Sequence, residues 1–140
     1  MKKVALSIVA LVMLLALNMS SVFAEGLGRF EGQDVAVTRQ RQGWISVVPM
    51  DSVYVKLYRP PIYIIGITSY TVNTFTEEVR SSSSLSIKFN YDTKDIYNYN
   101  PNRSGVWVKD QGWGTGTDFE QARERYYNKI FYKCYNIPFF

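Results

Sequence analysis

The segment Ile62–Ile67 constrains the fold of this chain most, because it is apolar on both faces of an extended strand. Only a strand that is covered on both sides favours that pattern, and six residues are too few for a helix to be the better interpretation. The β-branched content agrees with a strand. We therefore predict a sheet in which this segment is the central strand. Two of its side chains would point to one side and three to the other: Ile62 and Ile64, then Tyr63, Ile65 and Ile67.

The N-terminal segment 1–24 has the three parts of a secretory signal peptide. A pair of lysines begins it, Val4–Leu17 is the apolar part, and Val22 and Ala24 occupy the small-residue positions of a cleavage site. An uncleaved membrane anchor is the alternative, but the apolar run is shorter than the roughly 18–20 residues that a membrane span prefers. We expect cleavage, a mature chain from Glu25 without a membrane span, and export to the periplasm, the cell surface or the medium.

The charge of the chain is small once the signal peptide is set aside. The sequence has 16 Lys and Arg against 12 Asp and Glu, a net charge of +4. Without the two signal-peptide lysines the balance is 14 against 12, a net charge of +2. The basic residues are dispersed, so we predict no nucleic-acid binding. Cys134 is the only cysteine, which excludes a disulfide within the chain. It is either a buried small hydrophobe or half of a disulfide between chains.

Alternating polar and apolar residues predict several further strands. Glu25–Gly32 is rich in glycine and charge and predicts a flexible lead-in, followed by one domain over 33–140. Phe75 and Val79 allow the central strand to continue through Arg80, and the run Ser81–Ser84 predicts a polar turn. The segment Asn100–Gly105 predicts a loop. The other predicted strands are Asp34–Gln40, Trp44–Val48, Val53–Tyr58, Leu85–Tyr91, Ile96–Tyr99 and Val106–Lys109.

The end of the chain predicts a helix over 118–135. Thr117 and Glu120 have the spacing of a capping box, in which each side chain bonds to the backbone of the other residue. At about 100° per residue the helix has one apolar face, with Tyr127 beside it, that can pack on the sheet. The predicted fold class is α+β: an antiparallel β-sheet of about five to seven strands with one C-terminal amphipathic helix packed on it. The apolar face consists of Phe119, Ala122, Tyr126, Ile130 and Cys134.

The residue inventory argues against most enzyme classes. The chain has no histidine, which excludes Ser-His and Cys-His nucleophile pairs and histidine metal sites. A zinc site is not expected with one cysteine, and the nucleotide-binding glycine motifs are absent, so we predict no cofactor and no metal. Asp92 and Asp95 flank a predicted hairpin turn. They are turn residues, calcium ligands, or the acid pair of a glycosidase-like site.

Aromatic residues are the feature of the sequence that points to a binding surface. Four of them fall in a stretch rich in Asn and Gly, on predicted strands and loops. Tyrosine and tryptophan in that setting suit stacking on sugar rings or contact with protein partners. The alternative is that they cover the sheet and pack the loops, because both residue types are good strand formers. The candidate ligand-binding surface consists of Tyr97, Tyr99, Trp107 and Trp113.

Two segments carry a resemblance to known proteins. Tyr91–Ile96 (YDTKDI) followed by Val106–Lys109 (VWVK) resembles the strand–loop–strand of small exported proteins of the surface-adhesin E type. The predicted helix with its ending Tyr135–Phe140 is similar to secreted proteins of unknown role from Gram-negative-type Firmicutes. The match covers less than half of the mature chain. It implies a surface or periplasmic β-rich module and brings no catalytic residues with it.

The leading hypothesis is an exported, non-enzymatic binding or interaction module at the bacterial cell envelope, with an envelope glycan or a protein as its partner. It requires the four rings to be exposed and clustered. One alternative is a small carboxylate-dependent hydrolase or lyase, with Asp92 and Asp95 in a cleft beside a Tyr or Arg. The other is a structural or assembly subunit of the cell surface, joined through Cys134 or through an open strand edge.

Overall fold

A computed structural model describes residues 26–39, 43–100, 105–114 and 116–140. The predicted signal peptide and most of the predicted loop at 100–105 lie outside these ranges. The described elements follow in the order η1 (Gly28–Phe30), β1 (Val35–Arg39), β2 (Trp44–Pro49), η2 (Met50–Ser52), β3 (Tyr54–Arg59), β4 (Ile62–Asn73), β5 (Val79–Asn90), β6 (Asp95–Tyr99), β7 (Trp107–Lys109) and α2 (Thr117–Tyr135).

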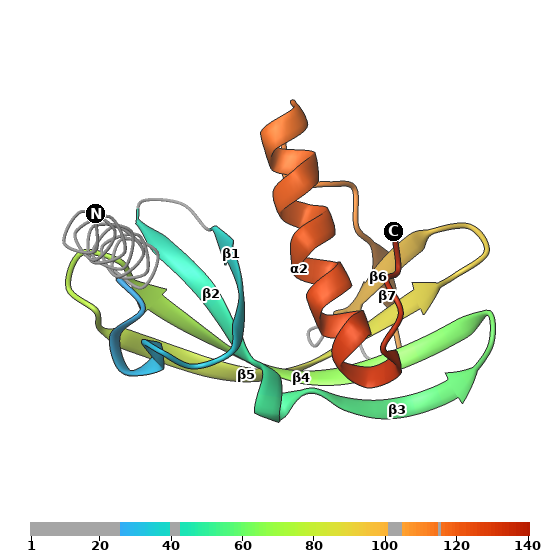
Figure 1. The fold of residues 1–140 in the computed structure, drawn as a ribbon, viewed down its shortest axis with the longest axis horizontal. Helices are drawn as coiled ribbons and strands as arrows, with labels where there is room; N and C mark the ends of the chain where they lie inside the picture. The colour runs from blue at the N-terminus through green and yellow to red at the C-terminus, as the bar shows by residue number, and fades with distance from the viewer. Residues whose placement is uncertain (1–25, 40–42, 101–104, 115) are drawn as a thin grey trace, which may run out of the picture.

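The strands form one antiparallel sheet of seven strands, and α2 packs on it (Figure 1). The strand order is β1-β2-β4-β5-β6-β7, and β3 pairs with the first half of β4. The sheet curves so that β1–β2 and β6–β7 rise on either side of α2. This arrangement confirms the predicted α+β class.

Strand β4 is the centre of the sheet, as the segment Ile62–Ile67 predicts. It pairs with β2, β3 and β5. Tyr63, Ile65 and Ile67 are buried in the main core under α2. Ile62 and Ile64 on the opposite side are only partly buried. The prediction that both faces are fully covered is therefore wrong for this half of the strand.

A second, smaller core lies on the other side of β4. Tyr70 and Val72 are an odd number of residues from Ile67, so their side chains leave the opposite side of the strand. Val72 is buried there with Phe30, Ile45 and Val47, and Tyr70 packs against them. Phe30 belongs to η1, within the predicted flexible lead-in, and its ring centroid lies 4.9 Å from that of Tyr70.

The serine run is the clearest error of the sequence-based prediction. Ser81–Ser84 is not a turn but part of the 12-residue strand β5, where it pairs with Thr68–Thr71. The chain turns earlier, after β4, where the side-chain oxygen of Asn73 accepts hydrogen bonds from the backbone N–H groups of Phe75 and Thr76. All four serines are exposed, so no apolar alternation marks the strand in the sequence.

Helix α2 begins without the predicted capping box. The N-cap residue is Gly116 with φ 110°, Thr117 already lies in the first turn, and no side chain caps the helix. A glycine with a positive φ and an extended ψ of 160° precedes the first turn, and no hydroxyl group caps the helix. The predicted helical face is confirmed at Tyr126 and Ile130.

The apolar face of α2 differs from the prediction at its ends. The first turns of α2 rise beyond the sheet (Figure 1), so Phe119 is 50% exposed and lies against Gly114. Phe131, which the predicted face omits, is fully buried among aromatic rings of the main core. Cys134 is only partly buried. The buried face is therefore shifted towards Tyr127 and Phe131.

The residues after α2 fold back onto it. Asn136 adopts a left-handed conformation and ends the helix. Phe139 is fully buried, and the side-chain oxygen of Asn128 accepts hydrogen bonds from the backbone N–H groups of Phe139 and Phe140, both at 2.8 Å. The Lys94 ammonium donates to the Phe139 carbonyl at 2.7 Å. The C-terminal residues thus complete the main core.

Candidate functional site

Three of the four predicted rings lie together on the face of the sheet opposite α2. Ile87, Phe89 and Ile96 are buried under the helix, so the residues that alternate with them point the other way. These are Lys88 on β5 and Tyr97 and Tyr99 on β6. Trp107 on β7 pairs with Tyr99 and shares its face. We call Lys88, Tyr97, Tyr99 and Trp107 the aromatic–lysine surface.

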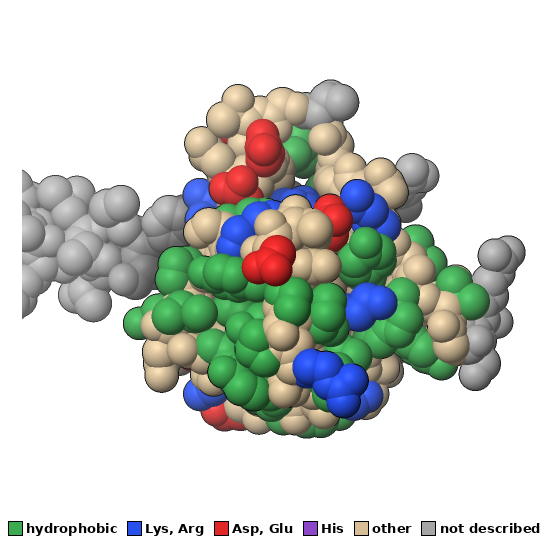
Figure 2. Space-filling model, turned by 90° about the vertical axis from the view of Figure 1, so that its right-hand side faces the viewer, with side chains coloured by type: hydrophobic (Ala, Val, Ile, Leu, Met, Phe, Trp, Pro, Cys, Tyr) green, Lys and Arg blue, Asp and Glu red, His purple; other side chains and the backbone are tan. Residues whose placement is uncertain are grey.

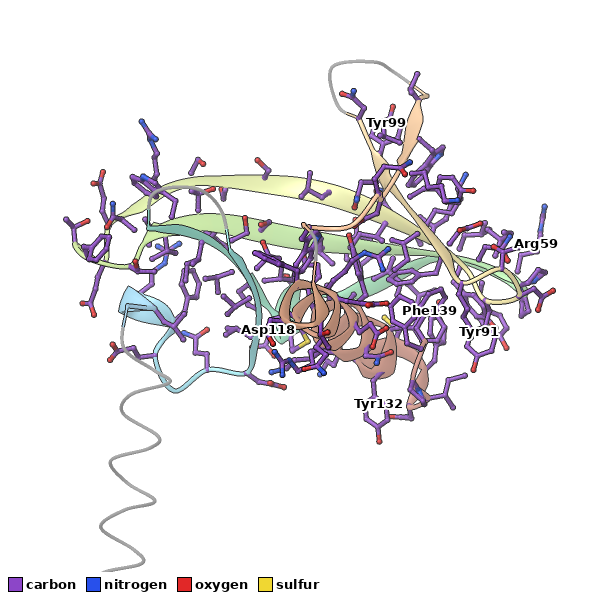
Figure 3. All side chains as sticks on the ribbon, turned by 90° about the horizontal axis from the view of Figure 1, so that it is seen from above. Arg59, Tyr91, Tyr99, Asp118, Tyr132 and Phe139 are labelled. Atoms are coloured by element: carbon purple, nitrogen blue, oxygen red, sulfur yellow. The ribbon has the colours of Figure 1, made fainter. Side chains whose placement is uncertain are left out.

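The side chains of this surface contact one another closely. The Tyr99 and Trp107 rings meet edge to face, with centroids 5.4 Å apart. The Lys88 ammonium lies 4.7 Å from the centroid of Tyr97 and 4.9 Å from that of Trp107. The three rings are each partly buried. Figure 3 places Tyr99 on the β6–β7 ribbon, away from α2.

Two further lysines border the aromatic–lysine surface, and each has a polar partner. The Lys56 ammonium donates to the Ser86 hydroxyl at 2.7 Å. The Lys109 ammonium lies 3.1 Å from a carboxylate oxygen of Asp95. Hydrogen bonds from Lys109 and Thr93 lower the pKa of Asp95 below its ordinary value. At the border of the surface, the charge of Lys109 is therefore balanced by Asp95, and the ammonium of Lys56 is hydrogen-bonded to a neutral group.

Trp113 does not join the other three rings. Its centroid lies 5.3 Å from that of Tyr126 and 6.0 Å from that of Tyr127, both on α2. The loop after β7 carries Trp113 to the helix side of the sheet, where it packs against the main core. The prediction of a four-ring surface is therefore wrong for Trp113. Trp113 is a packing residue, which was the alternative interpretation of these rings.

Asp92 and Asp95 do not form an acid pair in a cleft. Asp92 is exposed in the β5–β6 turn, where its backbone N–H donates to the side-chain oxygen of Asn90. Asp95 is held in the surface ion pair with Lys109. Among the residues that the structure describes, no three Asp, Glu or Cys side chains gather closely enough to hold a metal ion.

A buried carboxylate that the sequence analysis missed is Asp110. Its side chain is 5% exposed and accepts hydrogen bonds from the Tyr127 hydroxyl, the Arg123 guanidinium and the backbone N–H of Gly112. Burial by itself would raise the pKa of Asp110, but these bonds outweigh burial and hold the pKa below its ordinary value. Burial, followed by the bond to Asp110, raises the pKa of Tyr127.

The Asp110 cluster is best understood as a structural contact. Both carboxylate oxygens already accept bonds, so Asp110 is a poor proton acceptor for a substrate. The cluster joins the end of β7 to α2 and borders a polar hollow of about 360 Å³ that also contains Asp95 and Glu120. The four-residue spacing of Arg123 and Tyr127 was visible in the sequence, but their contact with Asp110 depends on tertiary structure.

A groove of about 530 Å³ lies between α2 and the start of β1. On its wall, Lys129 forms an ion pair with Asp34 at 2.7 Å and donates to the Val35 carbonyl at 2.7 Å. Lys133 and the half-exposed ring of Tyr132 also line it.

Cys134 lies on α2 and is partly buried. Burial raises the pKa of its thiol, which makes Cys134 a poor nucleophile for disulfide exchange.

The end of the molecule that holds the β3–β4 and β5–β6 turns exposes apolar side chains. Figure 2 shows hydrophobic side chains over much of this face, with basic side chains among them. Tyr58 is 65% exposed and Ile137 43%. The rings of Tyr58 and Tyr135 pack at 5.7 Å, so this exposed layer continues into the main core.

Comparisons of the chain with protein-family models, with curated proteins and with solved structures found no match. Within the described ranges, no helix has the length and apolar character needed to cross a membrane. The functional interpretation therefore depends on the geometry of the molecule.

Proposed function

We propose that this chain is an exported, non-enzymatic binding module of the bacterial cell envelope, and that the aromatic–lysine surface contacts its ligand. The observation that carries the proposal is a cluster of three partly exposed rings on the face that α2 leaves open, in which Tyr97 and Trp107 hold the Lys88 ammonium between them and Tyr99 packs on Trp107. All four side chains stand on paired strands, and a binding site on strands is held more rigidly than a site on loops.

The chemistry of this surface suits an envelope glycan. A sugar ring has an apolar face of C–H groups and a polar rim of hydroxyl groups. Tyrosine and tryptophan offer the matching combination of a flat apolar ring and a polar edge. Tyr97 and Trp107 present such rings on neighbouring strands. A protein partner would need a larger buried area than these few side chains supply.

A second candidate function, a subunit of a surface assembly, is favoured by the open edge of β5. Strand β5 pairs with β4 over most of its length but with β6 only over Ile87–Asn90. The remaining edge, which includes Ser81–Ser84, has no strand partner among the described residues. Such an edge can accept another strand. Sedimentation of the purified protein distinguishes the two candidates, because pairing at this edge would give an oligomer.

The test of the binding function is retention of the purified protein by insoluble peptidoglycan. The variant is Tyr97→Ala with Trp107→Ala, which removes two of the three rings. The control is Tyr132→Ala, which removes a ring that is 53% exposed on α2. Circular dichroism and urea unfolding verify that both variants are folded.

We expect wild type and control to be retained and the double variant to lose at least tenfold in affinity. Truncation of a central aromatic contact costs about 1–2 kcal/mol or more, and each 1.4 kcal/mol is about tenfold. Equal retention of the folded double variant would show that another surface binds. No retention of the wild type would contradict a peptidoglycan ligand.

A further inference from the structure

The Lys88 ammonium is fixed by two rings from two other strands. Lys88 on β5 pairs with Tyr97 on β6, and Trp107 stands on β7. The ammonium lies within 5 Å of both ring centroids, where the negative face of an aromatic ring attracts a cation. A free lysine on a sheet surface would sample many rotamers. Here the charge has a defined position before any ligand arrives.

The charge of Lys88 also lacks an opposite charge. Of the lysines on this face, Lys109 is paired with Asp95 and Lys56 donates to the Ser86 hydroxyl. No carboxylate in the described part of the chain forms an ion pair with Lys88. A cation with a defined position and no carboxylate partner favours an anionic group beside it.

We propose that the aromatic–lysine surface selects a glycopolymer that carries carboxylates beside its sugars, as peptidoglycan does on its peptide stems, with one of these carboxylates at Lys88 and a sugar ring on the neighbouring aromatic rings. This inference rests on the binding function proposed above and names the class of its ligand. The ammonium can interact with the two ring faces and with a carboxylate at once, because its three N–H donors point in different directions. A neutral sugar would stack on the rings but would leave this charge unpaired.

The discriminating variant is Lys88→Gln, which keeps a long polar side chain and removes the charge. Its matched control is Lys133→Gln, which removes an exposed charge from α2 and changes the net charge by the same amount. A third variant, Lys88→Arg, keeps both the charge and the contact with the aromatic rings. Urea unfolding of each variant separates loss of binding from loss of the fold.

The probes are peptidoglycan and the same peptidoglycan with its carboxylates converted to amides. We expect the wild type, Lys133→Gln and Lys88→Arg to prefer the native polymer by about two- to fivefold, the upper range of an ion pair at a protein surface. Lys88→Gln should bind both polymers equally and weakly. Raising sodium chloride from 50 to 500 mM should weaken the wild type more than Lys88→Gln, because salt screens the ion pair.

Two results would overturn the inference. If wild type and Lys88→Gln bind both polymers equally well, the surface binds a glycan but does not select a carboxylate, and the proposed function stands alone. If the wild type binds neither polymer, the proposed glycan-binding function fails and this inference fails with it.

Discussion

Replacement of Tyr127 by phenylalanine isolates the contact that joins α2 to the end of β7. Tyr127 is buried, and its hydroxyl donates to Asp110 and accepts from the Asn98 side chain at 3.4 Å. Phenylalanine keeps the ring, which packs against Phe89 and Tyr126 with centroids 6.0 Å and 5.0 Å away. The substitution therefore removes hydrogen bonds without opening a cavity.

The expected loss in the free energy of unfolding at pH 7 is about 2 kcal/mol. A hydrogen bond to a charged group contributes about 1.5–3 kcal/mol, and Asp110 keeps its bonds to Arg123 and Gly112. Asn98 is exposed, so water replaces the acceptor that it loses. The measurement is urea unfolding. If only stability has changed, the slope of the unfolding free energy against urea concentration should be the same for wild type and variant.

The effect of Tyr127→Phe should depend on pH in a defined direction. The pKa of Asp110 is lowered in the folded protein, so its stabilisation is present above the unfolded value of about 3.9 and is lost as the pH falls towards the folded value. The difference between wild type and variant should therefore shrink at pH 3. Tyr132→Phe, on an exposed ring, is the control and should have little effect at either pH. A difference below about 0.5 kcal/mol at pH 7, or an equal difference at both pH values, would refute the reasoning.

Two further predictions test the core and its tyrosines. Phe131→Ala should lower the free energy of unfolding by about 3–5 kcal/mol, because Phe131 is fully buried. Phe119→Ala should lower it by less than about 1 kcal/mol, because Phe119 is half exposed. Similar urea midpoints for the two variants would contradict the described helix face. Stability should also decline as the pH rises above about 10, the ordinary tyrosine pKa, because burial raises the pKa of Tyr135 to about 12 and raises that of Tyr126 as well. Urea midpoints between pH 9 and pH 11.5 measure this decline, and a constant midpoint would show that these hydroxyl groups are not buried.

Local periodicity was sufficient to predict most strands. Leu85–Tyr91 alternates because Ile87 and Phe89 enter the main core while Lys88 leaves it, and that alternation is visible without a structure. The same reasoning predicted Ile96–Tyr99, which is β6 within one residue. Periodicity failed at Ser81–Ser84, because this part of β5 lies at an open edge and exposes all four side chains, so it has no apolar pattern.

The candidate site was only partly predictable. Strand alternation puts Tyr97 and Tyr99 on one face of the sheet, and the local sequence predicts this. Trp107 joins that face because β7 pairs with β6. Trp113 lies in a loop, and a loop residue has no periodicity to assign its side. The pairing of β5 with β6 and of β6 with β7 brought Lys88 to Tyr97 and Trp107, and no spacing in the sequence indicates that contact.

The sequence by itself determined the central strand, the C-terminal helix and the α+β class, because each depends on residues that are close along the chain. The tertiary structure decided which side chains meet. The curvature of the sheet and the position of α2 placed Phe131 in the core and left Phe119 half exposed. They also closed the Asp110 cluster between β7 and α2 and left the face with Lys88 open. These outcomes depend on contacts between distant segments, which packing of the whole chain selects and local patterns do not specify.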